Sequence, residues 1–215
     1  MSERTPVQLR YDKAGPKVAA ALEKRHFQAQ YVSTREEAVQ LMLEWVGQDD
    51  VVSWGGSETL QSIGAQNAVR QAGRNVIDRD TAKTPQERVE LMRQALLCDT
   101  FLMSSNAVTE DGQLVNLDRN GNRVGALCYG PRHVIVVVGM NKVVPTVKDA
   151  VSRVRHTAAP ANVQRFAGNR TPCMETGLCA DCISEDCICA QMVITRVCRP
   201  AGRIRVILVG EDLGM

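Results

Sequence analysis

The chain has 215 residues, of which 44% are hydrophobic and 23% charged, values typical of a globular protein with one substantial core rather than of a disordered or fibrous chain. A formal net charge of +2 and an aromatic content of 4% argue against a nucleic-acid-binding surface, which needs massed positive charge or stacking rings. The sequence contains neither the apolar run of a secretory signal nor about 18 consecutive apolar residues, so we expect a cytoplasmic protein that binds no membrane and no nucleic acid.

The first half of the chain alternates between helical periodicity and short apolar runs. We expect one helix over about residues 17–30 and a second behind a capping box that begins at Ser33. The apolar run at residues 51–54 predicts a buried strand that ends at a pair of glycines. A helix over about residues 58–72 should follow and end at Gly73.

The same alternation continues to the end of the chain. Helices are expected to begin at Thr84, where a cap precedes proline, and near Gly121, and a long one spans about residues 146–166. Residues 112–118 have a hairpin-like pattern. The remaining apolar runs predict strands at residues 75–78, 100–104, 133–138, 192–197 and 204–209.

Strands separated by helices predict an α/β fold of three layers, in which helices cover both faces of a mainly parallel sheet. The last two strands flank a turn at residues 200–202, so we expect them to form an antiparallel hairpin at one edge of the sheet. We expect residues 1–215 to form a single α/β domain with a cysteine-rich loop insertion at residues 171–190.

The loop after the strand at residues 51–54 contains Gly55, Gly56 and Ser57. Glycines leave backbone N–H groups open to a phosphate or carboxylate, and loops at the carboxyl ends of parallel strands are the usual ligand sites of such sheets. The loop matches neither common glycine-rich nucleotide fingerprint, so it implies no nucleotide. A tight turn in which Ser57 caps the next helix explains the same residues equally well, and both interpretations stay open.

A polar segment follows the strand at residues 100–104. It includes Asn106, Thr109, Glu110 and Asp111, whose amide, hydroxyl and carboxylate groups could bind and polarise a small acidic or hydroxylated ligand. The pair formed by Asp111 and the glycine after it is also a common tight turn, which offers a purely structural explanation for that position.

Asn141 and Lys142 follow the most apolar strand and should also lie at a carboxyl edge of the sheet. Lys142 could neutralise an anionic ligand or, if desolvated, carry a proton. An exposed loop lysine is the common alternative. The three histidines of the chain are scattered and indicate neither a catalytic triad nor a histidine-rich metal site.

Five of the eight cysteines lie within residues 171–190, as one single cysteine, one C-x-x-C pair and one C-x-C pair. They are Cys173, Cys179, Cys182, Cys187 and Cys189. Because closely spaced thiolates can bind one ion together, this segment predicts zinc or an iron–sulfur cluster, with Cys198 as a further candidate ligand. A disulfide-stapled or simply reduced loop is the structural alternative, although a reducing compartment disfavours disulfides.

Taken together, these segments resemble the lactate-utilization (LUD) domain family over nearly the whole chain. Many short motifs in the same order make the resemblance specific. The residues that carry it are 54–60, 76–80, 104–112, 114–116, 120–124, 130–131, 141–142, 158–160, 171–173 and 210–214.

The resemblance implies a fold similar to that of the ribose-phosphate isomerase, glucosamine-phosphate deaminase and CoA-transferase group. In that group the glycine loop and the carboxyl edge of the sheet form the ligand site. The resemblance therefore implies that the glycine loop holds the anionic end of a ligand and that the polar segment and the lysine lie around it. The implied ligand-binding residues are Gly55, Gly56, Ser57, Asn106, Thr109 and Asn141. Glu110, Asp111 and Lys142 lie near them in this arrangement and are the candidate catalytic residues, although the resemblance assigns no reaction.

The resemblance also implies a metal bound by cysteines, as an iron–sulfur cluster or zinc. Similar family members tend to carry four of the cysteines and to have an arginine at the position of Cys187. The implied metal ligands are Cys173, Cys179, Cys182 and Cys189. The family is tied to lactate oxidation alongside iron–sulfur proteins, which implies a small anionic metabolite and iron–sulfur oxidoreductases as partners, and a homo-oligomer stays open.

Three hypotheses for the function follow. The first is an accessory or ligand-binding component of lactate-type organic-acid oxidation with a cysteine-bound metal centre. The second is an isomerase- or transferase-like enzyme for a small phosphorylated or CoA-linked substrate, with Glu110 or Asp111 as the base and Lys142 as the acid. The third makes the cysteine segment a docking module for an iron–sulfur partner. The sequence does not decide whether the protein is an enzyme.

Overall fold

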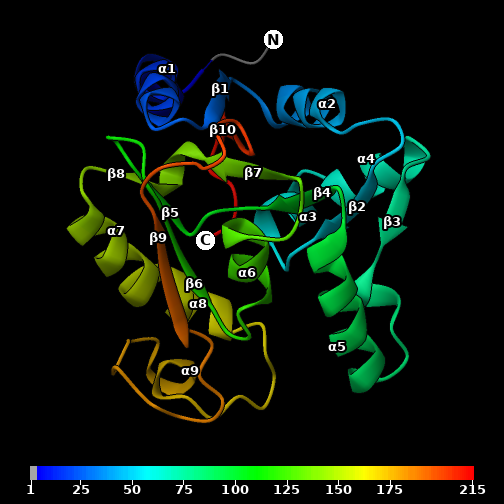
Figure 1. Cartoon of the computed structure of the whole chain (residues 1–215). Coiled ribbons are helices and arrows are strands. Elements are labelled where there is room, and N and C mark those ends of the chain that lie inside the picture. Colours follow the sequence, from blue (N-terminus) through cyan, green and yellow to red (C-terminus); the bar gives the residue numbers. More distant parts are fainter. Residues whose placement is uncertain (1–3) are drawn as a thin grey trace.

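A six-stranded, all-parallel sheet with the strand order β1-β10-β7-β4-β2-β3 forms the centre of the computed structural model, which describes residues 4–215 (Figure 1). Two of its interior strands, β10 and β7, consist largely of apolar residues, as expected for strands buried on both faces. The strands are β1 Gln28–Val32, β2 Val51–Trp54, β3 Asn75–Ile77, β4 Thr100–Met103, β7 His133–Gly139 and β10 Ile204–Val209.

Helices cover both faces of this sheet, which confirms the predicted three-layer α/β fold. Successive residues of β7 point to opposite layers: Val134 and Val136 pack in one hydrophobic cluster with α1 and α6, whereas Ile135 and Val137 pack in another with α2, α3 and α4. The helices are α1 Pro6–Lys24, α2 Arg35–Trp45, α3 Glu58–Ser62, α4 Ala65–Gln71, α5 Pro85–Gln94 and α6 Asn122–Cys128. Across residues 4–215, no helix is both long enough and apolar enough to span a membrane.

A second, four-stranded sheet with the order β8-β5-β6-β9 lies beside the first. The strands are β5 Ala107–Thr109, β6 Leu114–Asp118, β8 Val143–Val144 and β9 Gln191–Thr195. A hairpin is present, since β5 pairs antiparallel with β6, but residues 112–118, for which the sequence predicts a hairpin-like form, supply only its turn and its second strand. Its helices are α7 Val147–Arg153 and α8 Ala159–Val163, joined by a π-helical turn over Val154–Ala158, and α9 Pro172–Thr176 follows in the cysteine segment.

Local capping fixes several helix starts where the sequence predicts them. Thr34 and Thr84 each accept a hydrogen bond from the backbone N–H three residues later and begin α2 and α5. The first helix differs from the prediction: it begins at Pro6 behind a capping box on Thr5 and ends at Lys24, and the last predicted residues form β1. The predicted helix at residues 58–72 is split at Gly64, whose φ of 70° no helix accommodates.

The last two predicted strands do not pair with each other. β10 enters the middle of the parallel sheet, between β1 and β7, and β9 pairs antiparallel with β6 in the second sheet. The expectation of a closing hairpin is therefore wrong. A position inside the parallel sheet, with helices on both faces, buries the apolar side chains of β10, and Val206, Ile207 and Leu208 are fully buried. The antiparallel pairs are instead those of β6.

Gly112 allows the β5–β6 turn to pack against α1, and a side chain here should destabilise the fold. Its φ is 87°, and a Cβ would lie 2.6 Å from the backbone of Ala21. Gly73 has a similar φ of 71° with nothing within 4 Å. In urea unfolding, Gly73→Ala should cost about 1 kcal/mol for the left-handed backbone, and Gly112→Ala should cost roughly 2 kcal/mol more for the clash. Equal losses would contradict this packing.

Candidate functional site

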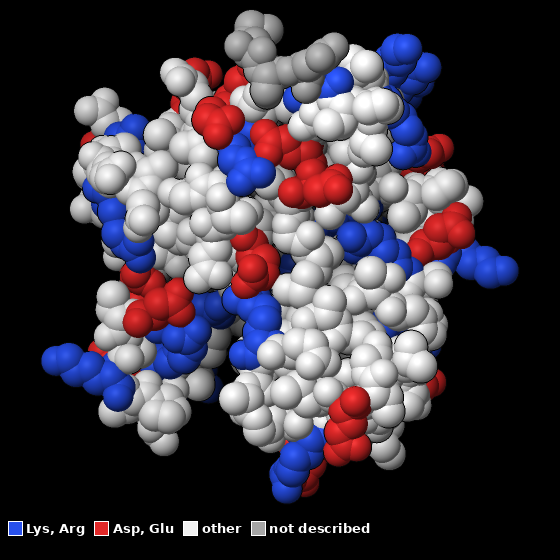
Figure 2. Space-filling view, turned by 180° about the vertical axis from the view of Figure 1, so that it is seen from behind, with Lys and Arg blue, Asp and Glu red and all other residues white. Residues whose placement is uncertain are grey.

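A cavity of about 420 Å³ lies at the carboxyl ends of the parallel strands, where open α/β sheets bind their ligands. The loops after β2, β3, β4 and β7 contribute Ser57, Arg79, Ser104 and Lys142 to its wall. The helix α5 forms one side of the cavity, and the second sheet and α8 form the other. Figure 2 shows the opening as a hollow beside the part of the molecule that contains α5, with basic side chains gathered around it.

Lys142 is buried in the wall of this cavity without an acidic partner. It follows β7 directly and is 4% exposed. Its Nζ donates hydrogen bonds to Thr59 Oγ1 at 2.8 Å and Ser104 Oγ at 3.3 Å. None of the ion pairs among residues 4–215 involves it. Burial, and then the charges of Arg153 and Arg123, lower its pKa from 10.5 to about 7.

Arg123 is also buried, but its guanidinium is fully bonded. It donates to Ser104 O at 2.8 Å, to Asn116 Oδ1 at 2.9 Å and to Asn106 Oδ1 at 2.8 Å. It also donates to the carbonyl of Leu117, and its Nε lies 3.3 Å from Asp118 Oδ1. Burial lowers the pKa of the guanidinium, yet Arg retains its charge in proteins. Arg123 therefore joins the loop after β4 to β6.

The glycine loop has two distinct roles. Gly55 does not line the cavity; a Cβ at this position would lie 3.0 Å from Cδ of Arg123, so the glycine makes room for that side chain. Gly56 lines the cavity, and a Cβ there would lie 2.6 Å from Nη2 of Arg79. Ser57 also lines it and accepts a hydrogen bond from Leu60 N at 3.2 Å, so the helix-cap interpretation is confirmed. The helix cap does not test whether Ser57 also binds a ligand, so that interpretation stays a prediction.

Arg79 is a second cation of the cavity without a close acidic partner. Its nearest carboxylate is that of Asp80, at 3.9 Å from Nε, and Nε itself is buried without a hydrogen-bond partner among the described residues. Burial and the charge of Arg88 lower its pKa. The sequence analysis did not identify Arg79 as a site residue. It lies in the loop that follows β3, at the carboxyl end of a parallel strand, and this position is the signal that could have identified it.

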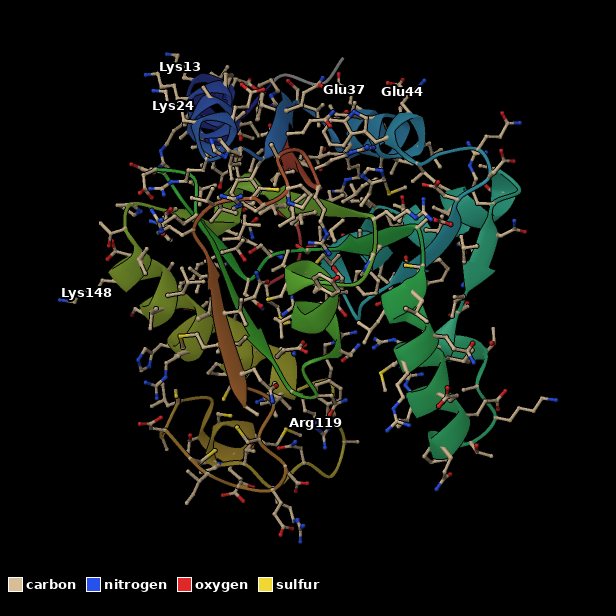
Figure 3. All side chains as sticks on the ribbon, viewed as in Figure 1. Lys13, Lys24, Glu37, Glu44, Arg119 and Lys148 are labelled. Carbon is tan, nitrogen blue, oxygen red and sulfur yellow. The ribbon has the colours of Figure 1, made fainter. Side chains whose placement is uncertain are left out.

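The cavity wall as a whole is positive, with six basic and two acidic residues. Glu58 and Asp118 are each paired, with Arg165 at 2.8 Å and Arg123 at 3.3 Å. Arg119 lies just after β6, beside the cysteine segment (Figure 3). The basic residues are Arg79, Arg88, Arg119, Arg123, Lys142 and Arg165. Such a wall favours an anionic ligand.

The acidic turn predicted to face the glycine loop lies elsewhere. Asn106 lines the cavity at the start of β5, but β5 carries the chain away by roughly 3.3 Å per residue. Glu110 borders a surface groove along α1 and does not line the cavity. Asp111 forms an ion pair with Arg25, and a hydrogen bond from Thr109 is the main reason that its pKa is lowered. Thr109, Glu110 and Asp111 thus belong to the hairpin turn.

Asn141 holds the last residues of the chain beside the cavity. Its Oδ1 accepts a hydrogen bond from Leu213 N at 3.1 Å, and its Nδ2 lies 3.3 Å from Gly214 O. Met215 lines the cavity. Of the predicted site residues, Gly56, Ser57, Asn106 and Lys142 therefore line the same cavity. Asn141 does not line it but binds the backbone of residues 213–214 beside it.

The cysteine segment lies next to the cavity. Ile188, which stands between Cys187 and Cys189 in the sequence, forms part of the cavity wall. The Sγ atoms of these two cysteines are 3.3 Å apart. Within residues 4–215, no group of three or more His, Cys, Asp or Glu side chains is already arranged to hold a metal ion. The predicted metal centre therefore stays a prediction at this point.

Comparison with known proteins places this geometry in context. A family model described as the LUD domain matches residues 16–209. The fold is similar to the crystal structure of a DUF162 family protein from Deinococcus radiodurans, with a TM-score of 0.56 and 15% sequence identity over 92% of this chain and 97% of that chain. At this identity the likeness shows the fold alone. No curated protein matches the chain.

The buried lysine should make stability depend on pH. The unfolded lysine keeps its proton up to pH 10.5, whereas the folded one loses it near pH 7. The unfolding free energy should therefore rise between these values, by at most about 1.4 kcal/mol per pH unit. Lys142→Met should remove this rise and stabilise the protein below pH 7, because no charge is then buried. Urea unfolding from pH 6 to 9.5 measures both effects.

Exposed Lys148 supplies the control, since Lys148→Met should retain the wild-type pH dependence. A Lys142→Met protein with the same pH dependence as the wild type would show that Lys142 is not the group responsible.

Proposed function

The chain belongs to the LUD domain family, and we propose that it is a ligand-binding component of lactate-type organic-acid oxidation whose cavity holds a small hydroxy acid. One observation carries this proposal: the ammonium group of Lys142 is buried in the cavity wall, and its hydrogen-bond partners among residues 4–215 are hydroxyl groups only. A buried charge is costly unless it is paired. An anion in the cavity supplies the missing partner.

The cavity offers complementary groups for each part of such a ligand. Among the described residues, Lys142, Arg79 and Arg119 are the basic residues of the wall that lack a close carboxylate. Arg119 is exposed, so Lys142 and Arg79 are the two that can take the acid group inside the cavity. Asp118 Oδ2 is buried without a hydrogen-bond donor among the described residues, so it can accept a bond from a ligand hydroxyl. Phe166 and Ile188 provide an apolar wall for the carbon skeleton. The volume of about 420 Å³ is at the small end of ligand pockets.

A second candidate function is an enzyme that acts on a small phosphorylated or CoA-linked substrate, and the pKa of Lys142 favours it. An amine with a pKa of about 7 exchanges protons readily at neutral pH, as a general acid or base must. The basic rim formed by Arg88, Arg119 and Arg165 would suit phosphoryl groups. Glu110 and Asp111 do not line this cavity, so their proposed role as base has no support from the geometry.

Titration calorimetry with four probes separates these functions. Lactate should bind, and propionate, which lacks only the hydroxyl, should bind more weakly because Asp118 Oδ2 then stays without a hydrogen-bond donor. Lys142→Met and Arg79→Gln should each lower lactate affinity about 10- to 100-fold, the worth of one charge-assisted hydrogen bond. Lys148→Met is the matched control. Ribose 5-phosphate and acetyl-CoA test the second function, and preferential binding of either, or unchanged lactate affinity in Lys142→Met, would overturn the first.

The affinity for a carboxylate should also fall as the pH rises above 7. Only the protonated lysine attracts the anion, and the free protein loses this proton near pH 7. The association constant should therefore decrease by up to about tenfold per pH unit until the pKa of the complex is reached. Calorimetry at pH 6, 7, 8 and 9 measures this decrease. Arg79→Gln should keep the pH profile at lower affinity, and Lys142→Met should flatten it; a flat wild-type profile would contradict the assignment.

A further inference from the structure

The two hydroxyl groups beside Lys142 are both oriented to accept hydrogen bonds from it. Thr59 Oγ1 donates its own hydrogen to Leu213 O at 3.2 Å. Ser104 Oγ donates its hydrogen to Ser105 O at 3.4 Å. Each oxygen therefore offers only lone pairs to Nζ of Lys142, and each accepts a hydrogen bond from it. Two N–H groups of the amine are occupied in this way.

This arrangement suits an amine that has lost its third proton. The nitrogen of a lysine side chain has four tetrahedral positions, and the carbon stem takes one of them. A protonated amine fills the last position with a third N–H donor, whereas a neutral amine has its lone pair there. The neutral form keeps both hydrogen bonds of Nζ, so the position left for a ligand holds the electron pair of a nucleophile.

Gly214 keeps the space beside this amine open. A Cβ at residue 214 would lie 3.2 Å from Nζ of Lys142 and 2.7 Å from Thr59 Oγ1. Lys142, Thr59 and Ser104 all line the cavity of about 420 Å³. A small ligand in this cavity can therefore approach the amine without meeting a side chain from residue 214.

The surroundings of Lys142 make its neutral form abundant at neutral pH. Burial, and then the positive charges of Arg153 and Arg123, lower the pKa of the amine to about 7, so about half of these amines are neutral at pH 7. A lysine with the ordinary pKa of 10.5 is neutral in roughly one molecule in three thousand at this pH. Lys142 should therefore react with electrophiles far more readily than an exposed lysine does.

Arg79 frees Lys142 from the task of holding the acid group of a ligand. Its guanidinium lines the same cavity, lacks a close carboxylate and keeps its charge at every pH of interest. In a 2-oxo acid the carbonyl carbon is bonded directly to the carboxylate. Such a molecule offers an anion to the guanidinium and an electrophilic carbon to the amine at the same time.

We propose that Lys142 binds small 2-oxo acids covalently, as an imine between Nζ and the carbonyl carbon. The inference rests on the proposed function, because oxidation of the hydroxyl group of a 2-hydroxy acid gives a 2-oxo acid of the same size and charge. It goes beyond that function because the bond is covalent and the bound molecule is the oxidised one.

Imine formation here needs no oxidant and no further reactant. The lone pair of neutral Nζ forms a bond to the carbonyl carbon, and the electron pair of the C=O double bond moves to the oxygen. That oxygen takes up a proton that the nitrogen loses, and the hydroxyls of Thr59 and Ser104, which bond Nζ, are placed to carry it. The resulting hydroxyl group then leaves as water with a second proton, and the nitrogen lone pair completes the C=N bond.

Reductive trapping of the full chain tests this bond directly. The protein is incubated at pH 7 with pyruvate and sodium cyanoborohydride, which reduces an imine to a stable secondary amine. Intact mass spectrometry should show a single pyruvate-derived adduct on each chain, and peptide mapping should place it on Lys142. Lys142→Met should lose the adduct, and Lys148→Met, which changes a lysine that extends into solvent (Figure 3), should keep it. Propionate, which has no carbonyl carbon outside its acid group, should give no adduct.

The trapping result is separable from lactate binding. Lactate should slow the trapping of pyruvate, because both ligands use the same cavity. Lactate that binds in calorimetry while pyruvate leaves no adduct on Lys142 would overturn the imine and leave the ligand-binding function intact. An adduct on Lys142 in a protein that does not bind lactate would support the imine and count against that function. Adducts spread over several exposed lysines, without enrichment at Lys142, would also overturn the imine.

Discussion

The site depends on the buried guanidinium of Arg123. Its donors reach the loop after β4 through Ser104 O, and β6 through Asn116 and Asp118, so one side chain fixes the parallel sheet against the second sheet. Gly55 leaves the space that this side chain occupies. A buried charge with all its partners in place is rigid, and removal of one partner would leave the others unsatisfied. The shape of the cavity follows from this network.

Two buried cations in one cavity therefore have opposite functions. Arg123 donates all its hydrogen bonds to acceptors within the protein, so its role is structural. Lys142 has only the hydroxyls of Thr59 and Ser104, and Arg123 itself contributes to the positive surroundings that lower the pKa of the lysine. Burial is the main reason that the pKa of Lys142 is lowered to about 7, followed by the charge of Arg153, and the framework charge of Arg123 adds to both. The structural and the chemical parts of the site are electrostatically coupled.

Local signals in the sequence predicted most helices and strands, whereas the pairing of the strands depends on long-range contacts that the sequence pattern does not reveal. The caps at Thr34 and Thr84 and the apolar run of β7 act within a few residues, so the three-layer fold and the positions of Ser57 and Lys142 could be inferred. Which strand pairs with which depends on contacts between distant segments, and the hairpin expected of β9 and β10 failed for this reason. The direction of β5, which takes Glu110 away from the cavity, is equally invisible in the sequence pattern.

The insertion of β10 between β1 and β7 links the two ends of the chain during folding. Among the described residues, β1 pairs with β10 alone, with Gln28 beside Arg205 and Val32 beside Val209. During synthesis β1 must therefore wait for β10 before it can be paired within this sheet, and the segment that closes between Val32 and Ile204 contains the other strands. Until β10 is in place, one side of β7 is an open, apolar edge, and such an edge favours aggregation.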